Sequence, residues 1–111
     1  MDQIVEKGLL YDYYGKLLTK RQQQIYEDAV SNDLSLSELA DAYEISRQGV
    51  HDLLKRCDKT LAEYEEKLGC IKRDREIIKI ADRLKDEAKT LSPSEISGMA
   101  DEILRCMKEE A

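Results

Sequence analysis

The spacing of apolar residues between Val50 and Leu68 most restricts how this chain can fold. The apolar positions recur at alternating steps of four and three residues: Val50, Leu54, Cys57, Leu61, Tyr64 and Leu68. This alternation places them on one side of an α-helix that packs along another helix. We therefore predict a helix from Arg47 to about Leu68, roughly 30 Å long, with Gly69 as its end.

The rest of the chain also has helical spacing. Apolar residues predict helices over 2–14, ending near Gly15, and over 71–90. Three segments begin with a capping residue followed three positions later by Gln or Glu, which is typical of helix starts: Thr19 with Gln22, Ser35 with Glu38, and Ser92 with Glu95. Pro93 then occupies the first position of the last helix. Strand-like alternation does not appear, so the predicted fold class is all-α.

Composition supports long helices and sets limits on chemistry. The chain has 111 residues, one Pro, five Gly and 38% charged residues, which fits one domain with a helical extension. Three widely spaced cysteines and a single His predict reduced thiols, with no metal and no cofactor. Neither a phosphate-binding Gly-rich loop nor a catalytic constellation is recognisable, so we expect no enzymatic activity. Without a secretory signal or an apolar run long enough for a bilayer, a cytoplasmic protein with no membrane insertion is expected.

Residues 35–60 have the pattern of a helix-turn-helix. A short helix from Ser35 is followed within about three residues by a second capping residue, Ser46. The expected buried positions are Leu39, Ala40, Ile45, Val50 and Leu53, with the small Ala40 allowing the helices to cross closely. We therefore divide the chain into a helix-turn-helix domain, residues 1–69, and C-terminal helices, residues 70–111, that serve packing or dimerisation.

Residues of this region resemble two related groups of proteins. "LLTKRQQQIYEDAVSNDLSLSELADAYEISRQGVHDLLKR" is similar to the C-terminal promoter-reading domain of bacterial sigma factors. The YlxM-like family adds an N-terminal "YG-x-LLT" segment and a continuation similar to "LAEYEEKLG", so the resemblance covers about residues 10 to 69. It implies an all-helical, dimeric, cytosolic bacterial protein without assigned enzymatic activity. It also implies an association with the signal recognition particle and its targeting GTPases.

In a helix-turn-helix, the first turns of the second helix enter the major groove of DNA. Arg47 and Gln48 are the candidates for base contacts, because Arg pairs with guanine and Gln with adenine through two hydrogen bonds. The full set of nucleic-acid-binding candidates is Lys20, Arg21, Ser46, Arg47, Gln48, His51, Lys55 and Arg56. The alternative is an ordinary solvent-exposed helix surface.

Two features oppose a strong nucleic-acid site. The formal net charge is −6, whereas affinity for nucleic acids depends on Lys and Arg that neutralise phosphates. In addition, Glu44 occupies a turn position that is often Gly, and Gly49 lies inside the second helix. If Glu44 is left-handed, it costs about 1 kcal/mol, and Gly49 costs about another 1 kcal/mol relative to Ala.

The apolar positions of the long helix also predict an interface. The second half of that helix should extend past a compact three-helix core and expose Leu61, Tyr64 and Leu68, which would mark a contact surface. We predict a homodimer or helix-packing interface formed by Leu61, Tyr64, Leu68, Ile77, Ala81 and Leu84. An intrachain helical hairpin is the alternative to the homodimer.

Two functional hypotheses follow. The first is a regulatory or accessory helix-turn-helix protein that binds nucleic acid, DNA or a structured RNA. The second is a protein-interaction adaptor that keeps the helix-turn-helix as a scaffold. Its partner, by the family resemblance, would be a component of the signal recognition particle, either the targeting GTPase or the RNA.

Overall fold

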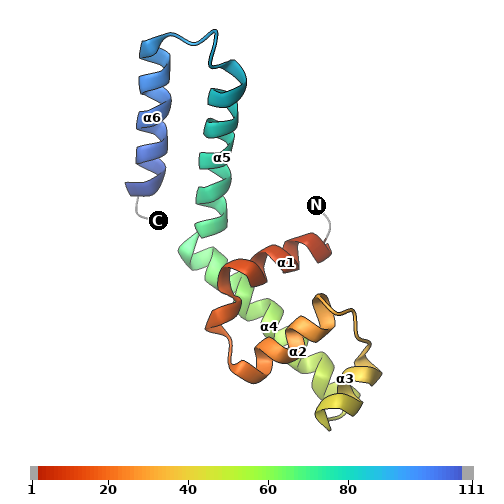
Figure 1. The fold of residues 1–111 in the computed structure, drawn as a ribbon. Coiled ribbons are helices and arrows are strands. Elements are labelled where there is room, and N and C mark those ends of the chain that lie inside the picture. Colours follow the sequence, from red (N-terminus) through yellow and green to blue (C-terminus); the bar gives the residue numbers. More distant parts are fainter. Residues whose placement is uncertain (1–2, 109–111) are drawn as a thin grey trace. The chain divides into compact units, whose positions relative to one another are not determined.

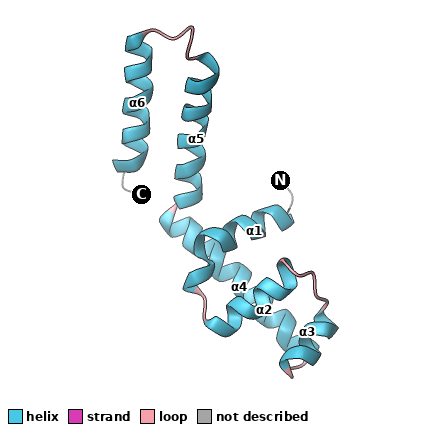
Figure 2. Ribbon diagram, viewed as in Figure 1, coloured by secondary structure: helices cyan, strands magenta, loops and turns pink. Residues whose placement is uncertain are grey.

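A computed structural model of the chain describes residues 3–108, which contain six α-helices, one 3-10 turn and no strand (Figures 1 and 2). The predicted all-α fold is confirmed. The elements in chain order are α1 (Gln3–Tyr14), η1 (Gly15–Leu17), α2 (Lys20–Val30), α3 (Leu36–Tyr43), α4 (Arg47–Leu68), α5 (Cys70–Glu87) and α6 (Pro93–Lys108). The chain divides into two compact units, Met1–Lys67 and Leu68–Ala111. We call them the N-terminal unit and the C-terminal hairpin.

The capping boxes predicted at the helix starts are present. At α2, the backbone N–H of Gln22 donates to the Thr19 hydroxyl over 3.1 Å, and the Thr19 N–H donates to the Gln22 side chain over 2.9 Å. The same reciprocal pair joins Ser35 to Glu38 before α3, and Ser92 to Glu95 before α6. Each pair satisfies two backbone groups that have no partner inside the helix.

One predicted helix end was wrong. The helix expected over 71–90 runs from Cys70 only to Glu87. The carbonyl oxygen of Glu87 accepts hydrogen bonds from the N–H groups of Thr90 and Leu91 and from the Thr90 hydroxyl, which closes the chain into a turn. Pro93 also restricts the residue before it to extended backbone, so the helix has to stop before the next one begins.

Of the five positions predicted to be buried in the helix-turn-helix, Leu39, Ala40 and Val50 are buried, whereas Ile45 and Leu53 are partly buried. Ile25 from α2, Leu39 and Ala40 from α3, and Val50 from α4 form one buried cluster, with Ile25, Leu39 and Val50 fully shielded from solvent. The partly buried side chains packed against it are Ala29, Leu34, Leu36, Tyr43, Ile45, Leu53 and Leu54. Helices α2, α3 and the first half of α4 therefore form the three-helix core that positions the start of α4.

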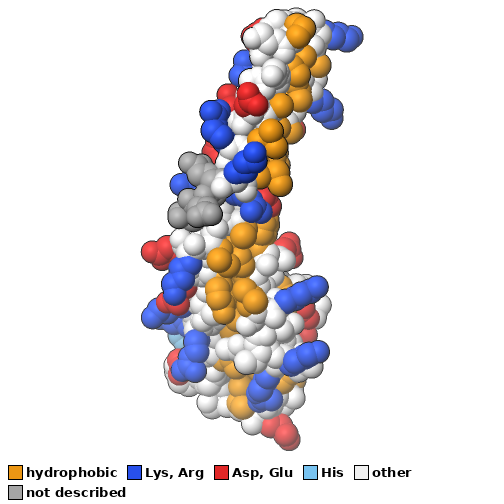
Figure 3. Space-filling view, turned by 90° about the vertical axis from the view of Figure 1, so that its left-hand side faces the viewer, with side chains coloured by type: hydrophobic (Ala, Val, Ile, Leu, Met, Phe, Trp, Pro, Cys, Tyr) orange, Lys and Arg blue, Asp and Glu red, His pale blue; other side chains and the backbone are white. Residues whose placement is uncertain are grey.

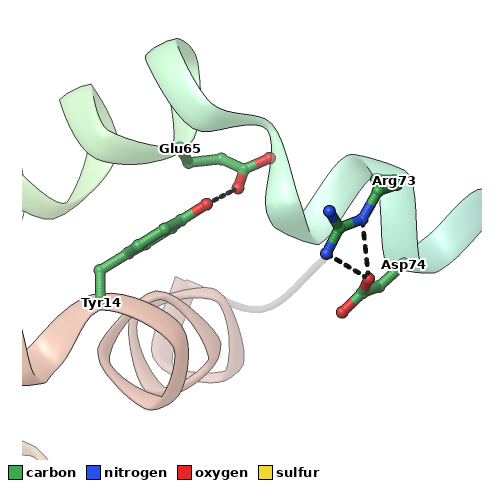
Figure 4. Close-up of polar contacts among 4 residues, drawn as sticks. All are labelled: Tyr14, Glu65, Arg73 and Asp74. Carbon is green, nitrogen blue, oxygen red and sulfur yellow. Dashed lines mark hydrogen bonds and ion pairs between the residues drawn. The ribbon is translucent and has the colours of Figure 1, made fainter. Parts of the chain in front are cut away.

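The expectation that Leu61 is exposed was wrong. Leu61 has no exposed surface, and Tyr64 is half-buried. The Tyr14 ring, at the end of α1, lies 6.0 Å from the Tyr64 ring, and the Tyr14 hydroxyl donates to Glu65 (Figure 4). The end of the N-terminal helix thus contacts the second half of α4, next to the buried Leu61 in the sequence. Of the three residues expected to be exposed, Leu68 is 53% exposed.

Tyrosine hydroxyls link the packed helices of the N-terminal unit to carboxylates. Tyr11 on α1 donates to Glu27 on α2, and Tyr26 on α2 donates to Asp58 on α4. Tyr43 on α3 donates to Asp28 on α2. Together with Tyr14 and Glu65, these pairs join α1 to α2, α1 to α4, α2 to α4 and α2 to α3.

These links shift the pKa values of their members. Burial and the hydrogen bond to Glu27 raise the pKa of Tyr11 to about 12, and burial followed by the bond to Asp58 raises the pKa of Tyr26. The bond to Asp28 raises the pKa of Tyr43, and the same bond lowers the pKa of the Asp28 carboxyl. The folded unit therefore favours protonated tyrosine next to an ionised carboxylate.

The C-terminal hairpin consists of α5 and α6, which run antiparallel and pack along each other (Figure 1). Met99 is buried, and Ile77 and Leu84 are half-buried, whereas Ala81 is exposed. The hairpin also leaves large apolar side chains in solvent: Ile78 is 55% exposed, Leu104 49% and Met107 65%. Figure 3 shows hydrophobic side chains gathered in a band along the upper part of the view, which is the hairpin.

Candidate nucleic-acid interface

The turn between α3 and α4 contains a left-handed residue at the position that is often Gly. Glu44 is left-handed, with φ at 56°, and its N–H donates to the Ala40 carbonyl; the Ile45 N–H donates to the same oxygen over 3.1 Å. This arrangement closes the end of α3 and directs the chain into α4. Because a left-handed residue other than Gly is strained by its Cβ, Glu44 keeps the cost of about 1 kcal/mol that we expected.

Ser46 caps α4 through the backbone of Gly49. The Gly49 N–H donates to the Ser46 hydroxyl over 2.9 Å. A Cβ added at Gly49 would lie 3.1 Å from that hydroxyl oxygen, which is tighter than an ordinary contact. A side chain at position 49 would therefore require the Ser46 hydroxyl to shift by a few tenths of an ångström. Because the Ser46 hydroxyl accepts the hydrogen bond from the Gly49 N–H, its role in the site is to fix the start of α4.

All of the predicted binding residues are exposed, and three of them lie together. Arg47, Gln48 and His51 line a shallow concavity of about 270 Å³ at the start of α4. Arg47, His51 and Lys55 are spaced four residues apart, so they form one row along the exposed side of the helix. Arg56 is exposed further along the same helix. The first turns of α4 thus present guanidinium, amide and imidazole groups to solvent.

Lys20 and Arg21 belong to a different part of the surface. Both begin α2 and both are exposed. The Arg21 guanidinium lies 5.8 Å from the centre of the Tyr43 ring and donates to the Tyr43 carbonyl over 3.4 Å. This position stabilises the last turn of α3, where backbone carbonyls lack helical partners and favour a cation. Arg21 therefore has a structural role in addition to any contact with a ligand.

Sequence reasoning missed one residue of the concavity and one residue beside it. Leu36, the first residue of α3, lines it together with Arg47, Gln48 and His51. Asp52 lies beside it, where its Oδ1 accepts from the Gln48 side-chain amide over 2.9 Å and lies 3.6 Å from the His51 Nδ1. The spacing of four residues between Gln48 and Asp52 was a sequence signal for that contact. Leu36 had no such signal, because its position depends on how α3 crosses α4.

Several carboxylates of the N-terminal unit form hydrogen bonds or ion pairs with other residues of the same unit. Asp58 accepts from the Tyr26 hydroxyl over 2.7 Å and pairs with Lys7 over 3.2 Å. Glu38 belongs to the capping box of α3, and the hydrogen bonds from Ser35 lower its pKa. Of the two acidic residues that lie among the basic residues of α4, Asp58 is thus neutralised locally. Asp52 stays beside the concavity.

The described residues contain neither a metal-binding cluster nor a membrane span. Within residues 3–108, no group of three His, Cys, Asp or Glu side chains is arranged to hold a metal ion. Over the same residues, no helix is long and apolar enough to cross a membrane. The cysteines are free thiols, and burial raises the pKa of Cys57.

Comparison with known proteins agrees with this arrangement of helices. The fold and the capped start of α4 define a helix-turn-helix protein. The family model described as "Putative helix-turn-helix protein, YlxM / p13 like" matches residues 1–101, so the chain belongs to this family, also called UPF0122. The predicted resemblance to YlxM-like proteins is confirmed.

Three relatives illustrate the similarity. A UPF0122 protein of Acetivibrio thermocellus is 40% identical over 108 residues, which cover 97% of this chain and 90% of the relative. A UPF0122 protein of Thermoanaerobacter sp. is 48% identical over 84 residues, 76% of this chain and 72% of the relative. One from Desulforamulus reducens is 56% identical over 64 residues, 58% of this chain and 55% of the relative. Similarity therefore extends to the C-terminal hairpin as well as the helix-turn-helix.

Proposed function

We propose that the N-terminal unit binds duplex DNA through the first turns of α4, in a regulatory or accessory role. The observation that carries this proposal is the exposed concavity lined by Arg47, Gln48 and His51 at the start of a capped α4. A recognition helix of a helix-turn-helix enters the major groove with the same turns. Arg47 and Gln48 would contact base edges, and Lys55 and Arg56 would contact phosphates.

The charge of the unit predicts modest affinity. The exposed part of α4 up to Lys59 carries Arg47, Lys55, Arg56 and Lys59 against Asp52, since Asp58 is paired with Lys7. Elsewhere the unit is acidic, so distant phosphates are repelled. Binding should therefore be strongest at low salt, where a few phosphate contacts contribute most.

A salt titration of duplex binding tests the proposal. Combined substitution Arg47→Ala and Lys55→Ala should weaken binding about 10- to 100-fold, and the dependence of log affinity on log salt should become shallower by about 1 to 2. The control is Lys85→Ala with Arg105→Ala, which removes the same charge from exposed positions of the C-terminal hairpin. Fluorescence anisotropy with a labelled duplex measures both. Equal losses in the two double variants would contradict the assigned surface.

A second candidate function is a protein-interaction adaptor. It is favoured by the exposed acidic side of the helix-turn-helix, where Glu38, Asp41 and Glu44 lie on α3 and the turn after it. In DNA complexes the first helix crosses the phosphate backbone, which carboxylates oppose. Under this proposal the family resemblance suggests a component of the signal recognition particle, its targeting GTPase or its RNA. Retention of the GTPase on purified protein after nuclease treatment would favour the adaptor, and its loss would favour nucleic-acid binding.

The C-terminal hairpin supports a further part of the proposal, a homodimer. Ile78 on α5 and Leu104 and Met107 on α6 are exposed apolar side chains, which a second hairpin would cover in a four-helix bundle. Light scattering should give the mass of a dimer at tens of micromolar for the wild type, and of a monomer for Leu104→Glu. The control Lys85→Glu, at an exposed polar position of α5, should leave the dimer intact. A wild-type monomer would contradict the proposal.

A further inference from the structure

The pair formed by Gln48 and Asp52 suggests how the concavity distinguishes bases, an inference that rests on the proposed binding of duplex DNA. Both side chains are exposed on α4, one helical turn apart. The Gln48 Nε2 donates to the Asp52 Oδ1 over 2.9 Å, and the His51 Nδ1 lies 3.6 Å from the same oxygen. The orientation of the Gln48 amide is thus set by a neighbour on its own helix.

The chemistry of Asp52 fixes which way the Gln48 amide faces. An ionised carboxylate only accepts hydrogen bonds, so the amide nitrogen has to face Asp52. The Gln48 carbonyl oxygen and the second N–H then stay available for a ligand. Without Asp52, an exposed glutamine would sample several rotamers and both amide orientations.

The groups that remain available match one base. Adenine presents the N6 donor and the N7 acceptor in the major groove, which pair with one carbonyl oxygen and one N–H of glutamine. Guanine presents two acceptors there, N7 and O6, and its O6 would face the Gln48 carbonyl oxygen. The Asp52 carboxylate adds a negative charge beside that oxygen and beside the phosphates.

We infer that Asp52 is a positioning residue that orients Gln48 to prefer adenine over guanine at one position of the bound site. Asp52 has two separable effects under this inference. Its acceptor oxygen sets base preference through Gln48. Its charge lowers affinity for every duplex, whatever the sequence.

Two substitutions separate these effects. Asp52→Asn removes the charge and replaces one of the two acceptor oxygens by an N–H₂ donor, whereas Asp52→Ala removes the charge and both acceptors. The probe is a DNA duplex with ten randomised base pairs between fixed flanks, and sequencing of the bound fraction measures base preference. Glu63→Ala, an exposed acidic position later on α4, controls for loss of charge alone.

The wild type should prefer adenine to guanine at one position by about tenfold. Asp52→Ala should reduce that preference to about twofold or less, and Asp52→Asn should give an intermediate value, because its amide can pair with either end of the Gln48 amide. Both variants should bind the unselected pool about two- to fivefold more tightly, because an exposed repulsive charge is lost. The Glu63→Ala variant should match the wild type in base preference.

An adenine preference that survives in Asp52→Ala would overturn the inference. So would a loss of preference in Glu63→Ala as large as in Asp52→Ala, since loss of charge alone would then explain it. A wild type that binds the pool through Arg47 and Lys55 but enriches no base also overturns the inference and leaves the proposed function standing. Binding unaffected by Arg47→Ala with Lys55→Ala overturns both.

Discussion

The N-terminal unit and the C-terminal hairpin use polar and apolar side chains differently. Among the described side chains, the six with less than 2% exposure, which include Tyr26, Leu39 and Leu61, all lie in the N-terminal unit. Its tyrosine–carboxylate hydrogen bonds join different helices. On α5, by contrast, the ion pair of Arg73 with Asp74 (Figure 4) and that of Arg83 with Glu87 join residues of one helix.

This difference indicates what each region needs in order to be stable. Contacts between helices stabilise a tertiary arrangement, whereas pairs of residues one to four positions apart stabilise the helix itself by only a few tenths of a kcal/mol. The hairpin buries fewer apolar side chains, such as Ile71 and Met99, and leaves Ile78, Leu104 and Met107 exposed. The N-terminal unit therefore has the larger core of its own, whereas stability of the hairpin depends more on its individual helices.

Truncation of one leucine in each region tests the comparison most strongly. Leu39→Ala should lower the free energy of unfolding by about 2–5 kcal/mol, because Leu39 is fully buried and a cavity remains. Leu104→Ala, at a position 49% exposed, should change the stability of the monomer by less than about 0.5 kcal/mol. Urea unfolding followed by circular dichroism measures both at low protein concentration. Equal losses of unfolding free energy in the two variants would show that Leu104 contributes to a core in spite of its exposed side chain.

Removal of one tyrosine hydroxyl tests the links between helices. Tyr26→Phe should lower the free energy of unfolding by about 1–2 kcal/mol, because the buried hydrogen bond to Asp58 is lost. Tyr64→Phe is the control, since the Tyr64 ring packs on Tyr14 at the half-buried end of α4. The free energy of unfolding, measured with urea, should be lower for Tyr26→Phe than for Tyr64→Phe by more than the error of extrapolation. A loss at Tyr64 as large as that at Tyr26 would argue against a special role for the Tyr26–Asp58 link.

The turn of the helix-turn-helix provides a smaller test, in the stabilising direction. Glu44→Gly should raise the free energy of unfolding by about 0.5–1 kcal/mol, because glycine adopts the left-handed conformation without strain. Asp33→Gly should give a smaller gain, although Asp33 also has φ at 56°, because Asp tolerates the left-handed conformation better than Glu does. Glu44→Gln controls for the lost charge and should leave stability nearly unchanged. A gain in Glu44→Gln equal to that in Glu44→Gly would assign the effect to charge.

The features that could be predicted from the sequence are those set by residues close together in the chain. The capping boxes at Thr19, Ser35 and Ser92 and the left-handed Glu44 follow from contacts within a few positions. The core of the helix-turn-helix could also be predicted, because periodicity defines the buried side of each short helix. The exposed first turns of α4 followed from the same periodicity.

The remaining features depend on residues far apart in the sequence. The contact of α1 with the second half of α4 is one of them, since Tyr14 lies 51 positions before Glu65. Periodicity placed Leu61 on the packing side of its helix, but it did not show that the side chain is fully buried within the chain. The tyrosine–carboxylate links have the same origin, since no local pattern pairs Tyr26 with Asp58. In the candidate site, Leu36 was missed for this reason, whereas Asp52 could have been found from its spacing.

Alkaline pH should distinguish the two regions by the smallest effect. All six tyrosines of the chain lie in the N-terminal unit, so the hairpin has none to titrate. The pKa of Tyr11 is raised to about 12, against about 10 in an unfolded chain. The unfolded state therefore loses its proton first, and the stability contributed by this group is complete below pH 10 and is lost as the pH rises toward 12.

Unfolding of the wild type and of Tyr11→Phe at pH 8, 10 and 11 measures that loss. The variant should be less stable at pH 8, where it lacks the hydrogen bond to Glu27, and its stability should fall less steeply above pH 10. After correction for intrinsic exchange rates, hydrogen exchange should show faster opening of the N-terminal unit at high pH. Exchange in the hairpin should become faster as well only if the stability of the hairpin depends on that unit. Parallel pH slopes in wild type and variant would mean that the Tyr11–Glu27 link does not hold α1 against α2.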